Sequence, residues 1–450
     1  MTALVISVAV QLMAIGLFAI GIAEFLSLLK GAFVLRRIAR AGTHNYTAVL
    51  LKSPLVPPVS TIAVPPDASP ESIRFARRLL ELHFGRNEVV VVLDGPSPSD
   101  MAVWHEEFHL CPSARAIGGN LPTAPVRGVY ESKDPIRIVV VEKDKGGPVD
   151  AWNAAVNACS SPVIGFLDPA SDFQPDILLR LIQPMLESTG EIIAVCSGVP
   201  APTGMGLTAR FGALQSLRDW MTRGAAFSDS NQTLPFPGAA ALVRRSSVLE
   251  AGGLTAGLLE LFLRLHGVSL AARKPYHILF LPEPITQSRT PVTRADLYQQ
   301  VLQDQREIAG AFFHRVSLAG PFGWRVLRSL FYSRALRPWL ETVAYILTIA
   351  GLVLGWVDIS TAVFLLLATV GMGIVLSMAA VVLREVAEPN SRDDRRLAAL
   401  FFAAIPENLG YRQLRNLWLI AGFRADPKEK ANRGKETQIP PAVSAASPSV

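Results

Sequence analysis

The amino terminus carries a long uncharged run, and a chain with such a run is restricted to folds that meet a membrane. No charged residue occurs from Ala3 to Ala23, and the apolar pattern continues past Glu24 to Leu29. At about 1.5 Å per residue, a helix over this run crosses the ~30 Å hydrocarbon core of a bilayer. No Lys or Arg precedes the run and no small-residue cleavage site follows it, which argues against a secretory signal peptide.

Two further apolar runs lie near the other end of the chain, at 342–357 and 359–383. They are separated by Asp358 and small residues, so we predict a transmembrane hairpin. Basic residues follow the first run and flank the hairpin on both sides: Lys30, Arg36, Arg37 and Arg40; Arg325, Arg328, Arg334 and Arg337; Arg384, Arg392, Arg395 and Arg396. The positive-inside rule places such flanks in the cytoplasm. We therefore expect a multi-pass protein of the inner (plasma) membrane with its main domain in the cytoplasm.

The composition divides the chain into six segments. They are an amino-terminal span with a basic flank, a cytoplasmic domain, an interfacial amphipathic segment, the hairpin, an interfacial or re-entrant segment, and a disordered tail, at 1–40, 41–315, 316–341, 342–383, 384–426 and 427–450. The net charge of +6 is mostly juxtamembrane. No basic stripe with interleaved aromatic residues indicates a nucleic-acid partner.

Within the cytoplasmic domain, short apolar runs alternate with amphipathic helical patterns. Buried strands are predicted at 59–64, 88–93, 136–141, 163–167 and 192–195. This alternation is typical of an α/β domain with a doubly wound, mostly parallel sheet, which is Rossmann-like. Asp67, Asp94 and Asp168 each follow a predicted strand. We expect them to gather along the edge where open parallel sheets hold their ligands.

Aspartates at that edge suit one kind of chemistry. A nucleoside diphosphate leaving group concentrates negative charge, so a site that releases it needs a hard cation held by carboxylates and phosphate oxygens. Asp94 and Asp168 would help to hold the nucleotide and a divalent metal, Mg or Mn. Aspartates at strand ends are equally common as turn formers or helix caps.

The order of motifs resembles the membrane-embedded glycosyltransferases of family 2, relatives of chitin, hyaluronan and poly-N-acetylglucosamine synthases. VSTIAVPPDASPESI, with Pro65 and Asp67, resembles the nucleotide-binding opening, and VVVLDG, ending at Asp94, the first aspartate motif. KGGPVDAWNAAVNACSSPVIGFLDPAS, with Asp168, is similar to the Gly-rich helix followed by the metal-binding aspartate motif. The resemblance implies a nucleotide-diphospho-sugar transferase fold.

The later motifs continue the resemblance. PFPGAAALVRRSSVLEAGGL, with Gly238, is similar to the acceptor-side segment, and LLELFLRLHGV to the helix that carries the acidic base. Gln303 and Arg306 match the QxxRW helix on the acceptor side. The resemblance implies inverting transfer of a sugar from a nucleotide-sugar donor to a lipid or polysaccharide acceptor, for polysaccharide biosynthesis.

The sequence departs from the family pattern at the reacting groups. Leu93 precedes Asp94 where the family pairs two aspartates, and Ala170 stands where the second metal-binding aspartate is expected, with Asp172 two residues late. Pro148 replaces the usual lysine after the Gly pair.

The expected Glu-Asp pair of the base falls on Gly257 and Leu258, and the tryptophan of QxxRW on Glu307. Glu260 is a weak candidate for the base, because one helical turn moves a carboxylate by about 5 Å.

These departures leave other functions open. The chain is then either an active transferase or a catalytically silent relative that binds a nucleotide-sugar or partners a synthase. Three spans are few for an enclosed polymer channel, so secretion of a long chain would require self-association or a partner synthase subunit. A third class is a zinc protease, because His105-Glu106-Glu107-Phe108-His109 contains HExxH. The alternative interpretation of this stretch is a solvated amphipathic helix.

Overall fold

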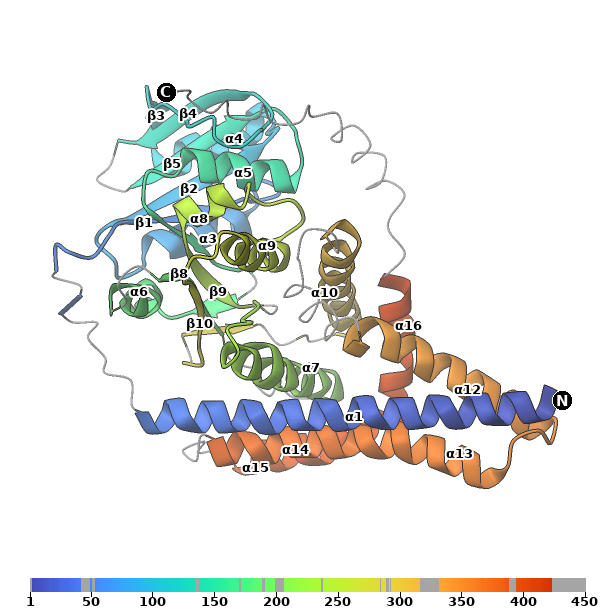
Figure 1. Ribbon diagram of the computed structural model, residues 1–450. Coiled ribbons are helices and arrows are strands. Elements are labelled where there is room, and N and C mark those ends of the chain that lie inside the picture. The colour runs from blue at the N-terminus through green and yellow to red at the C-terminus, as the bar shows by residue number, and fades with distance from the viewer. Residues whose placement is uncertain are drawn as a thin grey trace, which may run out of the picture.

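The structure is a computed structural model that describes residues 2–41, 49–50, 53–133, 137–169, 171–187, 191–198, 206–235, 238–283, 285–288, 291, 293–315, 332–387 and 394–422. A long helix, α1 (Thr2–Ala41), lies beneath an α/β domain, and further helices line both its sides (Figure 1). The predicted tail at 427–450 and most of the predicted interfacial segment, 316–331, lie outside the described residues.

A nine-stranded mixed sheet forms the centre of the α/β domain. In spatial order its strands are β10 (His277–Leu281), β8 (Ile192–Ser197), β9 (Ala240–Arg244), β6 (Val163–Phe166), β1 (Val59–Ala63), β2 (Asn87–Asp94), β5 (Ile138–Lys143), β4 (Val126–Ser132) and β3 (Leu110–Pro112). Only β9 and β4 run against the other strands. The predicted α/β fold with a mostly parallel sheet is therefore confirmed. A small antiparallel sheet joins β7 (Ser171–Phe173) to β11 (Thr286–Ser288).

Helices cover both faces of the large sheet. One face carries α3 (Pro70–Leu80), α4 (Pro98–Phe108) and α6 (Ile177–Glu187), and the other α5 (Pro148–Ala158), α8 (Arg245–Glu250) and α9 (Leu258–Ala271). Successive side chains of a strand point to opposite faces, so the unbroken valine run of β2 supplies both cores. Val89 and Val91 enter one core, and Val90 and Val92 the other.

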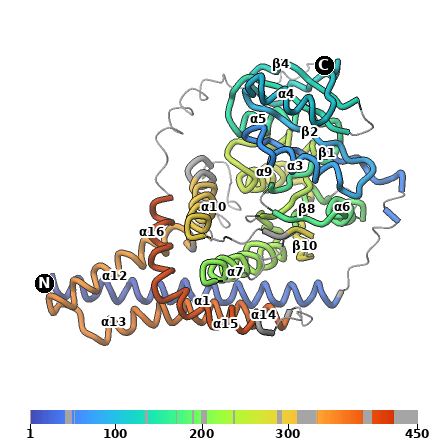
Figure 2. Tube along the Cα trace, turned by 180° about the vertical axis from the view of Figure 1, so that it is seen from behind, coloured from blue at the N-terminus to red at the C-terminus, as the bar shows by residue number. Residues whose placement is uncertain are grey.

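The core on the α5 side continues into the helices at the membrane end. It includes Leu28 and Leu35 of α1, Trp220 of the π-helix η1 (Trp220–Ala226) and Leu376 of α14 (Met372–Ala387). The helix α7 (Leu207–Asp219), which leads into η1, lies along α1 in both views (Figures 1 and 2). The α/β domain is thus packed onto the first apolar helix rather than joined to it by a linker alone.

Among the described residues, three helical stretches are long and apolar enough to cross a membrane: Thr2–Arg40, Arg334–Val353 and Ile359–Val386. The second begins before the predicted boundary at 342, in the π-helix η2 (Tyr332–Leu336), and continues through α12 (Arg337–Val353). Its first turns carry buried arginines, which a charge-based boundary excludes. The third comprises α13 (Ile359–Leu366), η3 (Leu367–Gly371) and α14. Their orientation across a membrane stays a prediction.

The predicted interfacial or re-entrant segment contains two helices. α15 (Asp394–Pro406) packs beside α14, and α16 (Arg412–Gly422) contacts both α12 and the long helix α10 (Arg294–Arg315). Between them, η4 (Glu407–Tyr411) is kinked, because Leu409 and Gly410 leave helical backbone angles. Gly410 has φ 120°, a conformation that favours glycine. After the kink, α16 packs against α10 and α12.

Candidate functional site

A cavity of about 670 Å³ opens at the carboxyl end of β6. This volume is in the range of about 300 to 1,000 Å³ that small-molecule sites occupy. We call it the Asp168 cavity. Its lining comes from α5, the segment after β6, the Gly238 loop, the start of α9 and the face of α10 that includes Gln303 and Glu307. The cavity therefore lies between the sheet edge and the helix that carries the last matched motif.

Asp168 follows β6 by two residues and is half-buried in the cavity wall. Its backbone oxygen accepts a hydrogen bond from the amide of Ser171 at 3.0 Å, which turns the chain into β7. Trp152 of α5 also lines the cavity and packs against Phe166 of β6, with ring centroids 5.6 Å apart. Asp168 thus follows a buried strand, as predicted, and lines a cavity that also contains an aromatic surface, whereas its ligand-holding role stays a prediction.

Glu307 is a cavity residue that the sequence indicated only as a departure from the motif. It lies on α10, half-buried, at the position expected to hold tryptophan. Burial raises the pKa of Glu307 to about 7, and the negative charges of Asp304 and Asp168 add to this, while Arg223 and a hydrogen bond from Gln303 oppose it. A carboxyl group with such a pKa exchanges protons near neutral pH, as a general base must.

The place of the missing base lies beside Glu307. A Cβ atom on Gly257, the residue before α9, would lie 3.9 Å from the carboxyl carbon of Glu307 and meet nothing closer. Gly257 and Leu258 both line the cavity. The carboxylate absent from the start of α9 is thus supplied to the same space by α10. Only a fold that packs α9 against α10 reveals this, because 50 residues separate the two positions.

Glu260, the weak candidate for the base, is not brought to the cavity. Its side chain is only 1% exposed and is not part of the cavity lining. Oε2 accepts hydrogen bonds from the backbone amide of Thr255, at 3.3 Å, and from the Thr255 hydroxyl. Oε1 lies 3.9 Å from Nε of Arg264. Glu260 therefore fixes the loop that precedes its own helix.

Asp94 is placed differently from what its motif predicted. The strand β1 separates β2 from β6, so Asp94 and Asp168 do not follow neighbouring strands. The carboxylate of Asp94 accepts from Nζ of Lys143 at 2.6 Å and from the amides of Gly146 and Gly147 at 2.8 Å each. Asp94 does not belong to the cavity lining. In this structure it therefore anchors the loop that begins α5.

The other predicted residues divide into two groups. Gly238 and Gln303 line the Asp168 cavity, and the Gly238 oxygen accepts from Ser171 and Thr286 at 3.2 Å each. Arg306, although it is on the same helix as Gln303, is exposed and outside the lining.

The predicted nucleotide residues Pro65 and Asp67 also lie outside it. Asp67 accepts from the amide of Ser69 and the hydroxyl of Ser72, both at 3.1 Å, at the start of α3. A hydrogen bond from the Ser69 side chain, together with these two bonds, lowers the pKa of Asp67. Whether they contact a nucleotide stays a prediction.

The side chains near Asp168 offer few ligands for a divalent cation. No group of three or more His, Cys, Asp or Glu that could hold a metal occurs among the described residues. The side chain of Asp172 is 74% exposed and lies 3.7 Å from Arg78. These residues do not form a preformed metal cage. Asp168 is the carboxylate that could share a cation with phosphate oxygens, and its role as a metal ligand stays a prediction.

The HExxH stretch does not form a zinc site. α4 ends at Phe108, and His109 has φ 47°, so it leaves the helix and does not share a helical face with His105. His105 Nδ1 lies 3.3 Å from the Leu110 oxygen, and its ring packs edge-on against Tyr130. The zinc protease alternative is therefore wrong, and the helix serves the core through Trp104 and Phe108.

Comparison with known proteins finds no matching family model. It also finds no matching curated protein. Among solved structures, a mannosyltransferase from Pyrobaculum calidifontis with GDP-Man and Mn²⁺ is similar at 15% identity, with 88% of this chain and 99% of that chain covered and a TM-score of 0.48.

Two other solved structures are also similar. Glucosyl-3-phosphoglycerate synthase from Mycobacterium tuberculosis, in complex with Mn²⁺, UDP and phosphoglyceric acid, has 15% identity, 62% and 84% coverage and a TM-score of 0.36. S. aureus TarS with UDP-GlcNAc has 12% identity, 79% and 92% coverage and a TM-score of 0.35. At such identities the likeness concerns the fold alone.

Proposed function

We propose that this chain is a membrane-bound glycosyltransferase that moves a sugar, with inversion, from a nucleotide-sugar donor to a lipid or polysaccharide acceptor. The observation that carries the proposal is the meeting of Asp168 and Glu307 in one cavity, with Glu307 beside the place where the motif lacks its base. The motif order along the sequence supports the same reaction. The restored carboxylate favours an active enzyme over a silent relative.

In the proposed reaction, ionised Glu307 removes the proton of an acceptor hydroxyl. The hydroxyl oxygen bonds to the anomeric carbon of the donor sugar from the face opposite the nucleotide. The bond between that carbon and the diphosphate oxygen breaks, and its electron pair leaves with the nucleoside diphosphate. Gln303 holds the Glu307 carboxylate by a hydrogen bond. Because the base and the leaving group stand on opposite faces, the sugar changes its anomeric configuration.

Other cavity residues are assigned by their positions. Asp168, at the end of β6, would face the donor diphosphate and any divalent cation that accompanies it. Trp152 offers an apolar surface for a sugar ring, and Gly238 lets the backbone approach the acceptor closely. The predicted nucleotide contacts of Pro65, Asp67 and Asp94 would require the donor to extend beyond the cavity along the sheet edge. A divalent cation, when bound, neutralises charge on the leaving group.

The test is release of nucleoside diphosphate by the purified full-length protein in a maltoside detergent, with UDP- and GDP-sugars and Mg²⁺ or Mn²⁺. We expect turnover by the wild type and a loss of about 10²- to 10⁴-fold in Glu307→Gln, the range for removal of a general base. Glu71→Gln, whose side chain is 86% exposed on α3, should keep the wild-type rate. Turnover that Glu307→Gln leaves unchanged would exclude Glu307 as the base. No turnover with any donor would favour the silent relative.

A further inference from the structure

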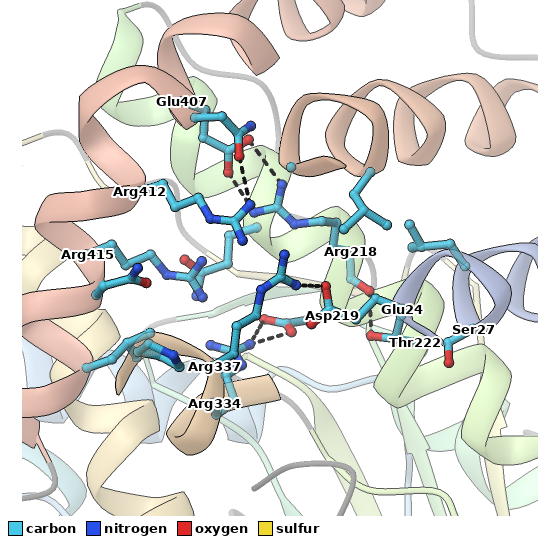
Figure 3. A pocket seen from close by; sticks show the side chains of 18 of the residues that line it. Glu24, Ser27, Arg218, Asp219, Thr222, Arg334, Arg337, Glu407, Arg412 and Arg415 are labelled. Atoms are coloured by element: carbon cyan, nitrogen blue, oxygen red, sulfur yellow. Dashed lines mark hydrogen bonds and ion pairs between the residues drawn. The ribbon is translucent and has the colours of Figure 1, made fainter. Parts of the chain in front are cut away.

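A second cavity, of about 160 Å³, lies where the α/β domain meets the apolar helices. Figure 3 shows Arg412 and Arg415 of α16 on one side and Arg218 and Asp219 of α7 on the other. Six arginines line this cavity: Arg218, Arg223, Arg334, Arg337, Arg412 and Arg415. The lining contains only three carboxylates, Glu24, Asp219 and Glu407. We call it the arginine cavity.

Five of the six arginines have carboxylate partners. Arg218 binds Glu407 at 2.6 and 3.0 Å. Arg334 binds Asp219 at 2.6 Å and lies 3.2 Å from Asp304. The remaining ion pairs are Arg223 with Asp304 at 3.0 Å, Arg337 with Glu341 at 2.9 Å and with Glu24, and Arg412 with Glu341 at 3.1 Å. These arginines share five carboxylates, so their charges balance.

Arg415 is the sixth arginine, and it adds one uncompensated positive charge. It makes no hydrogen bond or ion pair with any residue that the structure describes, and its Nε is buried. Burial lowers the pKa of Arg415 to about 10, and the nearby charges of Arg334 and Arg218 add to this, whereas Tyr411 and Asp219 oppose it. Nη2 of Arg337, which also lines the cavity, is likewise buried without an acceptor among the described residues.

Buried hydrogen-bond donors without acceptors destabilise a folded protein, and charged donors do so more than neutral ones. A phosphate group meets this need well, because its oxygens accept paired hydrogen bonds from the planar fork of a guanidinium. The cavity volume of about 160 Å³ is several times the ~30 Å³ that a water molecule occupies in the liquid. A phosphate group would therefore fit in the arginine cavity and supply the negative charge that balances its arginines.

The walls indicate where such a phosphate would come from. Each of the three candidate spans contributes to the lining: Ser27 lies in the first, Pro338 in the second and Leu376 in the third. A group bound there lies at the junction of the apolar helices and the cytoplasmic domain. Arg223 lines both this cavity and the Asp168 cavity, so the two are neighbours.

We propose that the arginine cavity is a binding site for a phosphate group, held by Arg415 and Arg337 and most naturally presented by the headgroup of a membrane lipid. The proposal does not depend on sugar transfer. It rests on the uncompensated charge, the buried donors and the contribution of all three candidate spans. The same chemistry would also accept inorganic phosphate, and the experiment separates the two sources.

The test measures the unfolding temperature of the full-length protein in a maltoside detergent, whose headgroup has no phosphate. One arm adds inorganic phosphate, and the other adds phosphatidic acid in mixed micelles. We expect phosphatidic acid to raise the unfolding temperature of the wild type. For the same rise, Arg415→Gln should need at least a tenfold higher concentration of phosphatidic acid. Protection by inorganic phosphate alone, lost in Arg415→Gln, would support the site and assign it to a soluble ligand.

Two further variants keep the test decisive. Arg37→Gln removes an exposed juxtamembrane arginine that does not line the cavity, so it should respond like the wild type. Arg415→Lys keeps the charge but loses the fork, and we expect an intermediate response. Without phosphate, Arg415→Gln should unfold at a higher temperature than the wild type, because it removes a half-buried positive charge that has no carboxylate partner among the described residues. Equal protection of the wild type and Arg415→Gln, or protection of neither, would overturn the proposal.

Discussion

The carboxyl carbon of Glu307 lies 3.9 Å from the position that a Cβ atom would take on Gly257. The first residue belongs to α10 and the second immediately precedes α9, so two different helices meet at one point of the Asp168 cavity. One position has lost the expected acidic side chain and the other has gained one. Glu307 therefore provides, from a different part of the chain, the carboxylate that Gly257 lacks.

This relationship predicts that the carboxylate can be moved back. In a Glu307→Gln background, Gly257→Asp should restore at least a tenth of the wild-type turnover, because it returns an ionisable oxygen to the same space. Gly257 has extended backbone, and its Cβ would make only ordinary contacts, so the substitution is sterically allowed. Aspartate is also a favoured residue at the start of a helix. The measurement is steady-state release of nucleoside diphosphate.

The matched control is Gly257→Asn in the same background, which has the same shape without the charge. We expect no recovery from it. If asparagine restores turnover as well as aspartate does, the benefit comes from helix capping, and Glu307 is not the base.

The raised pKa of Glu307 predicts the pH dependence of catalysis. A general base acts when it is deprotonated, and the pKa of Glu307 is raised to about 7 by burial and by the charges of Asp304 and Asp168. Turnover should therefore be constant above about pH 8 and fall about tenfold per pH unit below pH 7. In Gly257→Asp, with Glu307 intact, a second carboxylate should move this fall in turnover to higher pH. A fall in turnover centred on the ordinary pKa of a glutamate, 4.5, would contradict the assignment of Glu307 as the base.

The same shift predicts an effect on stability. The folded protein binds a proton at Glu307 more tightly than the unfolded chain does, because the folded pKa, about 7, is above the ordinary 4.5. The contribution of Glu307 to stability is therefore highest below pH 4.5 and falls as the pH rises to about 7, by up to about 3 kcal/mol. Glu307→Gln should remove this fall. Unfolding temperatures of both proteins at pH 5 and pH 8 provide the check, and equal pH dependence would disprove the shift.

Lys143 should be essential for the start of α5. It is fully buried, and its ammonium group binds the carboxylates of both Asp94 and Asp150. Lys143→Met would leave two carboxylates without their cation, which costs about 3 to 5 kcal/mol when a buried pair is broken. We expect a marked drop in the thermal unfolding temperature. Lys145→Met, an exposed lysine of the same loop, should change it little; an equal drop would show that loop composition, not the ion pair, matters.

His266 is predicted to make the protein sensitive to acid. Its Nε2 lies 3.1 Å from the Thr233 oxygen and must donate, so Nδ1 accepts from the Tyr276 hydroxyl at 3.0 Å. Burial lowers the pKa of His266 to about 4, against an opposing effect of the Thr233 carbonyl. Its stabilising contribution is complete above pH 6.5 and lost as the pH falls toward 4. At pH 8, His266→Gln should unfold at a lower temperature than the wild type. Between pH 6.5 and 4, its unfolding temperature should fall less than that of the wild type.

The sequence alone determined the order and type of the main elements. The valine run of β2 is apolar on both faces, and only a strand covered by helices on each side buries such a run, so its place inside the sheet was predictable. The end of β6 shortly before Asp168 followed from a short apolar run stopped by a charge. The long uncharged stretches were equally local signals, because a span depends on the length and composition of one segment.

Only the tertiary structure decided which carboxylates meet. Asp94 and Asp168 seemed equivalent along the chain, but β1 lies between their strands and Lys143 holds one of them outside the cavity. Glu307 reaches the space beside Gly257 because α10 packs against α9. Local patterns record how a segment buries its own apolar face, whereas a site depends on contacts between segments far apart in sequence. The sequence therefore indicated that the base motif lacks its acidic residue, but it did not indicate which residue takes that place.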